Sequence, residues 1–173
     1  QSSGHALLGW HSGGTSLAAG ARIDDHDRFG THTTFGANGS YDLGHGWRVR
    51  ASYGEGFKAP TLYQLYGEFV GSAALQPETS RSYDAGIELG DRNAHLHLGL
   101  TAFRRDSRNL IDLDSGFVSQ NGAQARAQGF EQLAHAEAVS PPGLEAAPEG
   151  GGEGVRIDLA VAFQDFDERQ SHL

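Results

Sequence analysis

The feature that most constrains the fold of this chain is a strict alternation of apolar and polar residues in two stretches, 47–56 and 82–90. Every second residue from 47 to 53 and from 83 to 89 is apolar, namely Trp47, Val49, Ala51 and Tyr53 in the first stretch and Tyr83, Ala85, Ile87 and Leu89 in the second. Successive side chains of a β-strand point to opposite faces. Each stretch is therefore predicted to be a strand with one apolar face and one charged face.

The intervening positions of these two stretches carry charged side chains well inside the predicted strands. Arg48 and Arg50 lie in the first stretch, and Asp84 and Glu88 lie in the second. If the two strands are neighbours, the arginines of one face the carboxylates of the other. We expect these charges to serve the structure of the sheet.

Similar alternations recur along the chain and predict further strands at 6–11, 15–24, 33–43, 94–103, 110–114, 119–131 and 155–163. Tight turns are predicted at Ser12-Gly13-Gly14 and Gly44-His45-Gly46, because glycine supplies the positive φ angles of such turns. Residues 140–154 contain three prolines, five glycines and three glutamates. This composition is typical of a flexible acidic loop.

The predicted connections alternate in length. Short turns at 44–46 and 91–93 alternate with longer polar connections at 25–32, 57–81 and 104–109. In an antiparallel meander, alternate connections lie at opposite ends of the sheet, so one end has tight turns and the other has long loops. Outer-membrane β-barrels have this asymmetry. A soluble or surface-exposed β-sandwich binding module is the alternative, because it also contains several short strands at regular spacing.

The composition limits the possible classes of protein. The chain of 173 residues is 38% hydrophobic and carries a formal net charge of −9. No stretch approaches the roughly 20 consecutive apolar residues of a membrane helix, whereas a barrel strand needs only about 9–11 residues, of which alternate ones meet lipid. The acidic balance argues against a nucleic-acid-binding protein, whose binding surface is basic.

The residue types that are missing carry further information. The chain has no cysteine, so disulfides, thiolate metal sites and cysteine nucleophiles are excluded. It also has no methionine and begins at Gln1, so we expect it to be a piece of a longer protein. Nucleotide-binding and nucleophile-elbow motifs are absent as well, and no enzymatic activity is predicted.

A series of short segments resembles the barrel domain of TonB-dependent outer-membrane receptors, most closely the cobalamin receptor branch. The clearest segment is RASYGEGFKAPTLYQLY, at residues 50–66, and it is followed by LQPETS at 75–80 and YDAGIE at 83–88. Other segments of the series lie at 21–30, 109–112 and 125–131. Together they extend over roughly residues 15–131 of the chain, and their order makes the resemblance specific.

The resemblance implies an all-β, antiparallel transmembrane β-barrel meander. Residues 1–173 would form part of the barrel domain, with about eight strands of a barrel of roughly 22. The plug domain and the box that contacts TonB would lie outside these residues. The implied location is the outer membrane of a Gram-negative bacterium, where the apolar face meets membrane lipid. The implied function is energy-coupled uptake of a large, scarce ligand, with cobalamin first and a ferric siderophore second, driven by the TonB complex.

Two groups of residues are candidates for binding. Tyr63, Tyr66 and Phe69 lie in the longest predicted loop, and aromatic side chains suit a large amphipathic ligand. Alternatively, residues of this loop serve only to fold it onto the rim of the barrel. Asp24, Asp25 and Asp27 form an acidic cluster that is a candidate calcium site, because carboxylates suit hard cations. Acidic extracellular loops without a metal are the more common case.

Overall fold

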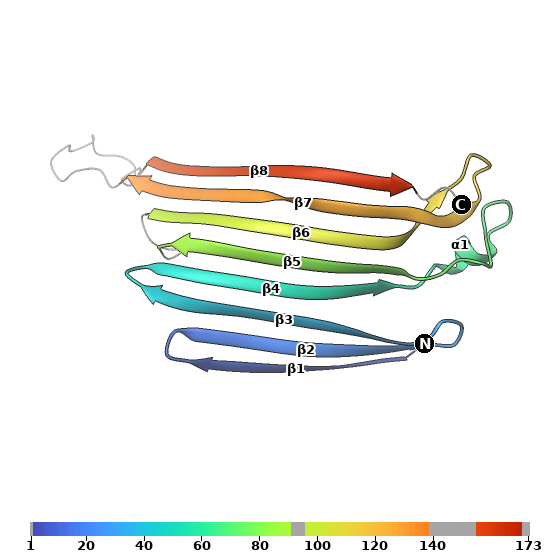
Figure 1. Cartoon of the computed structure of the whole chain (residues 1–173), viewed down its shortest axis with the longest axis horizontal. Helices are drawn as coiled ribbons and strands as arrows, with labels where there is room; N and C mark the ends of the chain where they lie inside the picture. The colour runs from blue at the N-terminus through green and yellow to red at the C-terminus, as the bar shows by residue number, and fades with distance from the viewer. Residues whose placement is uncertain (1, 91–95, 139–154, 171–173) are drawn as a thin grey trace, which may run out of the picture.

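In the computed structural model, residues 2–90, 96–138 and 155–170 are described, with side chains as far as residue 136. They form one antiparallel sheet of eight strands, in which every strand pairs with its neighbours in sequence (Figure 1). The strands are β1 (Ser2–Ser12), β2 (Thr15–His26), β3 (Gly30–Gly44), β4 (Trp47–Lys58), β5 (Glu78–Leu89), β6 (Leu96–Leu113), β7 (Ser119–Ala138) and β8 (Val155–Gln170). The predicted all-β antiparallel meander is therefore confirmed.

The two ends of the sheet differ in the connections that they carry. The turns between β1 and β2 and between β3 and β4 are tight and lie at one end, where Gly13, Gly14, Gly44 and Gly46 have positive φ angles. At the other end, the strands β4 and β5 are joined by a long connection that contains the short helix α1 (Leu62–Tyr66) (Figure 1). We call this the loop end of the sheet. The predicted turn at 91–93 and the predicted acidic loop at 140–154 lie outside the described residues.

Several strands are longer than their alternation predicts. The expected polar connection at 104–109 is wrong, because these residues lie inside β6 and continue its pairing with β5 and β7. Most of the expected connection at 25–32 is also strand, with only residues 27–29 between β2 and β3. In both cases the polar side chains do not end the strand, since the backbone ladder continues and they find partners across it. Arg126 of β7 forms an ion pair with Asp106, and the hydroxyl of Thr31 donates to Asp25.

The register brings the apolar residues of neighbouring strands onto one face, which we call the apolar face. In β4 and β5, Trp47 lies opposite Leu89, Val49 opposite Ile87, and Tyr53 opposite Tyr83. The same face carries large exposed hydrophobic side chains from β1 to β7, namely Leu8, Trp10, Leu17, Ile23, Phe35, Tyr41, Leu43, Leu98, Leu100 and Phe130. No second sheet of the described residues covers this face.

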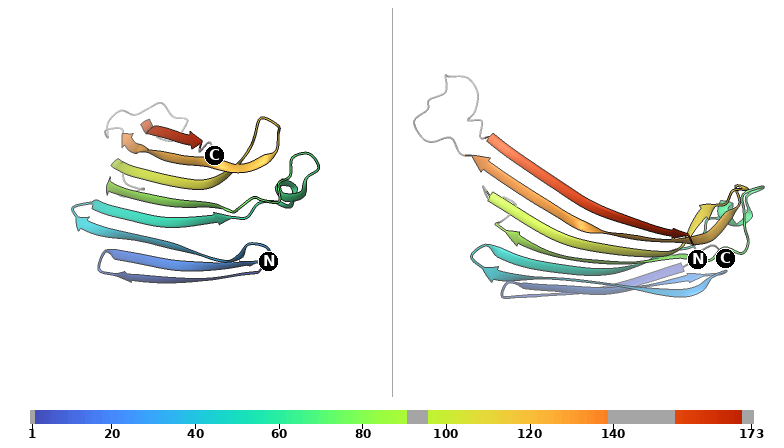
Figure 2. Two further views of the ribbon diagram at one scale, coloured as in Figure 1. Left: turned by 45° about the vertical axis from the view of Figure 1, so that its right-hand side comes forward. Right: turned by 45° about the horizontal axis from the view of Figure 1, so that its top comes forward.

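The sheet is a single curved layer (Figure 2). Among the described residues, the buried hydrophobic side chains are Leu65, Leu75 and Ala123, of which the first two belong to the long connection. A β-sandwich buries apolar side chains between two packed sheets, and the described residues contain only one sheet. The β-sandwich alternative is therefore wrong. The described residues also contain no helix that is long and apolar enough to cross a membrane.

The opposite, polar face contains the expected cross-strand contacts in part. Arg50 forms an ion pair with Glu88 at 2.9 Å, and its guanidinium donates to the hydroxyl of Thr101 at 2.8 Å. Asp84 accepts a hydrogen bond from Ser52 rather than from an arginine. The charges of this face therefore connect β4, β5 and β6, and they stabilise the wall as predicted.

Candidate functional site

The long connection between β4 and β5, residues 59–77, is the most elaborate segment of the loop end. Its helix α1 begins after Thr61, whose hydroxyl accepts a hydrogen bond from the backbone N–H of Gln64 at 3.2 Å. The side chain of Gln64 accepts in return from the backbone N–H of Thr61 at 2.9 Å. This capping box explains why so short a helix forms at this position. On its inner side, Leu65 is buried.

The connection is held on one side by Arg28, from the turn between β2 and β3. The guanidinium of Arg28 donates to the hydroxyl of Tyr66 and to the carbonyl oxygen of Ala73. It also lies 5.3 Å from the centroid of the Tyr66 ring, in the range of a cation–π contact. One side chain thus connects two loops that are far apart in the sequence.

The connection is held on the other side by the strand β7. The side-chain amide of Asn121 accepts from the backbone N–H of Gln76 at 2.6 Å and donates to the carbonyl oxygen of Gln76 at 2.9 Å. In addition, the backbone N–H of Ser119 donates to the carbonyl oxygen of Val70 at 2.8 Å. The connection is therefore fixed on both sides, to the turn between β2 and β3 and to β7.

Aromatic side chains project from this fixed connection. Tyr63 is 68% exposed and Phe69 is 86% exposed. Phe117, in the connection between β6 and β7, is 70% exposed and was not singled out in the sequence. Phe69 and Phe117 both have positive φ angles, of 79° and 62°, which are uncommon for bulky residues. Backbone strain of this kind is often found at functional sites.

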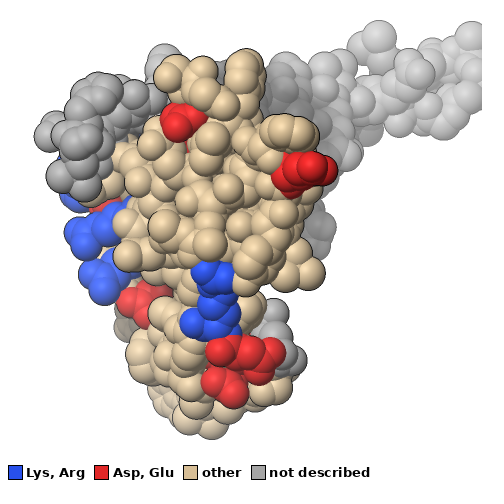
Figure 3. Space-filling view, turned by 90° about the vertical axis from the view of Figure 1, so that its right-hand side faces the viewer, with Lys and Arg blue, Asp and Glu red and all other residues tan. Residues whose placement is uncertain are grey.

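The three aromatic residues predicted for ligand binding thus have different surroundings. Tyr66 is engaged by Arg28, whereas Tyr63 and Phe69 point their rings to solvent. Around them, charged side chains lie in small groups and most of the surface of the loop end is uncharged (Figure 3). The loop end can therefore offer exposed aromatic rings on a fixed backbone to a large molecule.

The residues of the predicted calcium site do not face one another. Asp24 is buried and accepts hydrogen bonds from the guanidinium of Arg22 at 2.7–3.1 Å. Asp25 lies on the other face of β2 and accepts from the hydroxyl of Thr31 at 3.0 Å. Asp27 is exposed in the turn. In the part of the chain that the structure describes, no group of three or more acidic or histidine residues could hold a metal ion. Calcium binding here stays a prediction.

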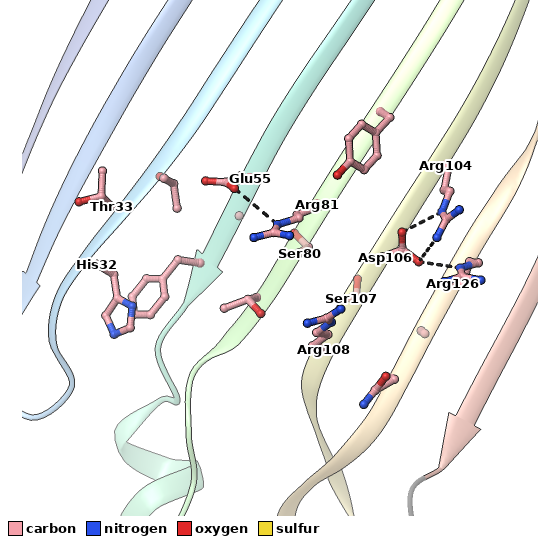
Figure 4. A pocket seen from close by; sticks show the side chains of 17 residues that line it. His32, Thr33, Glu55, Ser80, Arg81, Arg104, Asp106, Ser107, Arg108 and Arg126 are labelled. Atoms are coloured by element: carbon pink, nitrogen blue, oxygen red, sulfur yellow. Dashed lines mark hydrogen bonds and ion pairs between the residues drawn. The ribbon is translucent and has the colours of Figure 1, made fainter.

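A hollow of about 540 Å³ lies where β3, β4, β5, β6 and β7 approach the loop end (Figure 4). A row of alternating charges crosses it, with Glu55, Arg81, Asp106 and Arg126 directly opposite one another in four neighbouring strands. Arg81 lies 3.5 Å from Glu55, and Asp106 contacts Arg126 at 2.6 Å. Asp106 also contacts Arg104 of its own strand at 2.8 Å. We call the four residues that lie opposite one another, Glu55, Arg81, Asp106 and Arg126, the charge row.

The charge row lies on the continuation of the apolar face, because Glu55 and Arg81 alternate in phase with Tyr53 and Tyr83. The apolar face therefore changes from hydrophobic to charged within two residues along β4 and β5. No local sequence pattern indicates this row, since its members come from four separate strands. It becomes visible only when the register is known.

The fold and part of the sequence match known proteins. A family profile described as TonB dependent receptor-like, beta-barrel matches residues 1–141. The siderophore receptor PirA from Pseudomonas aeruginosa is similar over 95% of this chain and 33% of its own, with 27% identity and a TM-score of 0.69. The FrpB iron transporter from Neisseria meningitidis (14% identity, TM-score 0.70) is similar over 98% of this chain and 26% of its own.

A third structure, the copper transporter OprC, is similar over 98% of this chain and 28% of its own, with 14% identity and a TM-score of 0.74. At such identity the last two matches establish the fold alone. None of the three is a cobalamin receptor, so they do not support the expected similarity to the cobalamin branch. Because the family profile covers most of the chain, the chain belongs to the TonB-dependent receptor family and forms part of a β-barrel in the outer membrane of a Gram-negative bacterium.

Proposed function

We propose that this chain is part of a receptor that imports a ferric siderophore across the outer membrane with energy from the TonB complex. The observation that carries the proposal is the similarity to the siderophore receptor PirA, at 27% identity over 95% of this chain. Because the chain covers 33% of that receptor, the plug and the contact with TonB are expected in other parts of the protein. The eight strands would supply a sector of the barrel wall.

The exposed aromatic residues of the loop end support this role. Tyr63 and Phe69 stand on a connection that is fixed by Arg28 and Asn121. A fixed backbone reduces the entropy that is lost when a ligand is bound. Aromatic rings provide a large contact area for a siderophore, whose chelating groups and backbone are partly apolar. We therefore assign initial capture of the ligand to Tyr63 and Phe69, and Tyr66 is positioned by its contacts with Arg28.

Uptake measurements test the proposal. The full-length receptor should be produced in a strain that lacks its own siderophore receptors, and uptake of ⁵⁵Fe-siderophores should be compared with uptake of labelled cobalamin. We expect uptake of at least one ferric siderophore, and we expect it to stop when the TonB complex is inactivated. Uptake of cobalamin alone would instead support cobalamin as the ligand, as expected from the sequence, and would overturn the siderophore proposal.

A matched set of variants tests the aromatic residues. The double variant Y63A/F69A should weaken siderophore binding by about tenfold, since each ring loses a buried contact in the complex. Leu62→Ala is the control, because Leu62 lies in the same helix and is 77% exposed but carries no ring. Its affinity should stay within about twofold of the unmodified receptor. Equal losses in both variants would argue that the rings have no specific role.

A further inference from the structure

The charge row lies on the face of the barrel that meets lipid. Glu55 and Arg81 are in phase with Tyr53 and Tyr83, whose rings lie 5.1 Å apart at the edge of the hydrophobic band. Aromatic residues mark the boundary between the hydrocarbon and the headgroups in outer-membrane barrels. The charge row follows two residues further towards the loop end, which is about 7 Å along the strand. It therefore lies at the level of the lipid headgroups of the outer leaflet.

The arginines of this region differ in how closely carboxylates contact them. Asp106 forms ion pairs with both Arg104 and Arg126, at 2.8 and 2.6 Å. Arg81, in contrast, has its shortest contact with a carboxylate at 3.5 Å, from its Nε atom to Glu55.

Arg108 completes this arrangement. It is exposed and lies opposite Thr79, one step beyond the charge row and diagonally across from Arg81. Within the described ranges, no acidic side chain forms an ion pair with Arg108. Diagonal neighbours on adjacent strands are within reach of long side chains. Thr79 is exposed between them and carries a hydroxyl donor. Arg81, Thr79 and Arg108 all line the hollow of Figure 4.

We propose that Arg81, Arg108 and Thr79 bind a phosphate group of a lipid in the outer leaflet of the outer membrane. The planar guanidinium fork matches the geometry of a phosphate, and two such groups with a hydroxyl supply several donors. The adjacent Tyr53 and Tyr83 give the acyl chains of the same lipid an apolar surface. A headgroup is favoured over a free anion because the site continues directly into the hydrophobic band.

The test is lipid binding by the full-length receptor, refolded in detergent without native lipid. The probes are fluorescently labelled lipid A with both phosphates, the same lipid without phosphates, and sodium phosphate as a competitor. We expect the dephosphorylated lipid to bind about tenfold more weakly, since charge-assisted hydrogen bonds are lost. Sodium phosphate should not displace the lipid. Equally tight binding of free phosphate would overturn the lipid proposal and indicate a simple anion site.

The variant R81Q/R108Q should bind the phosphorylated lipid about tenfold more weakly. Arg105→Gln is the matched control, because Arg105 is also exposed and lies in β6 but points to the opposite face. Its affinity should stay within about twofold of the unmodified receptor. Unchanged binding by R81Q/R108Q, or an equal loss in R105Q, would refute the site. Heat-modifiable gel mobility shows whether the double variant forms a folded barrel. If it does not, the single variant R108Q is tested instead and should bind the phosphorylated lipid about threefold more weakly. Unchanged binding by R108Q would then refute the site.

Discussion

The strand wall and the long connection at residues 59–77 differ in what covers their hydrophobic residues. The wall exposes them, as with Ile87 and Leu100 on the apolar face. The connection exposes its aromatic rings but buries Leu65 and Leu75, and it is fixed by side-chain hydrogen bonds at both sides. The wall therefore depends on lipid to cover its hydrophobic face, whereas the connection is stabilised by contacts within the protein.

This difference indicates where each part tolerates change. A wall position that meets lipid requires an apolar side chain, while the next position along the strand meets the polar interior of the barrel. A position in the connection depends on the particular partner that its side chain contacts. Substitutions should therefore act on the stability of the whole barrel in the first region and on local opening in the second.

The largest expected effect comes from Ala51→Arg, in the strand β4. Ala51 is exposed on the apolar face, opposite Gly39 and Ala85, between the levels of Trp47 and Tyr53. An arginine on the lipid face near the middle of the bilayer destabilises a barrel by about 2–4 kcal/mol. Unfolding of the full-length receptor by denaturant in lipid vesicles, followed by heat-modifiable gel mobility, measures this loss.

A nearby position gives the matched control. Asn38 is exposed on the polar face of the neighbouring strand β3, opposite Ser52, so Asn38→Arg places the same charge in the interior of the barrel. We expect a change of less than about 0.5 kcal/mol in the unfolding free energy. If Asn38→Arg destabilised the barrel as much as Ala51→Arg, the assignment of the two faces would be wrong.

The same contrast explains which features could be predicted from the sequence. The faces of β4 and β5 were predicted correctly, because every position of these strands that meets lipid must be apolar. The continuation of β6 through Arg104 and Asp106 was missed, because polar residues beyond the hydrophobic band resemble a loop. Their partner Arg126 lies on another strand, and only the register shows that the three residues meet.

The connection was harder to predict than the wall. Its length, its position between two strands and its aromatic residues were evident, but the helix α1 is too short to show a helical period. Thr61 and Gln64 do have the spacing of a capping box, a signal that could have indicated the helix. The contact of Arg28 with Tyr66 joins residues from different loops, and no local pattern reveals such a pair.

The second prediction concerns that contact. Arg28→Ala removes the donors to the Tyr66 hydroxyl and the Ala73 carbonyl, together with the cation–π contact. Amide hydrogen exchange in residues 59–77 should become about tenfold faster, while exchange in the strands stays unchanged. Arg28→Lys keeps the charge but not the two-pronged donor, and it should recover only part of the protection. Full recovery by lysine would show that charge alone holds the connection.

The smallest expected effect comes from Thr61→Ala, which removes the hydroxyl that caps α1. The backbone N–H of Gln64 loses its acceptor at 3.2 Å, so the local stability of the helix should fall by about 0.5–1 kcal/mol. Amide exchange of Gln64 in the full-length receptor measures this loss. Thr61→Ser keeps the hydroxyl and should retain the protection, whereas an equal loss in both variants would assign the effect to the methyl group of Thr61. In either variant the unfolding free energy of the barrel should stay unchanged, because the cap contacts the connection and leaves the wall intact.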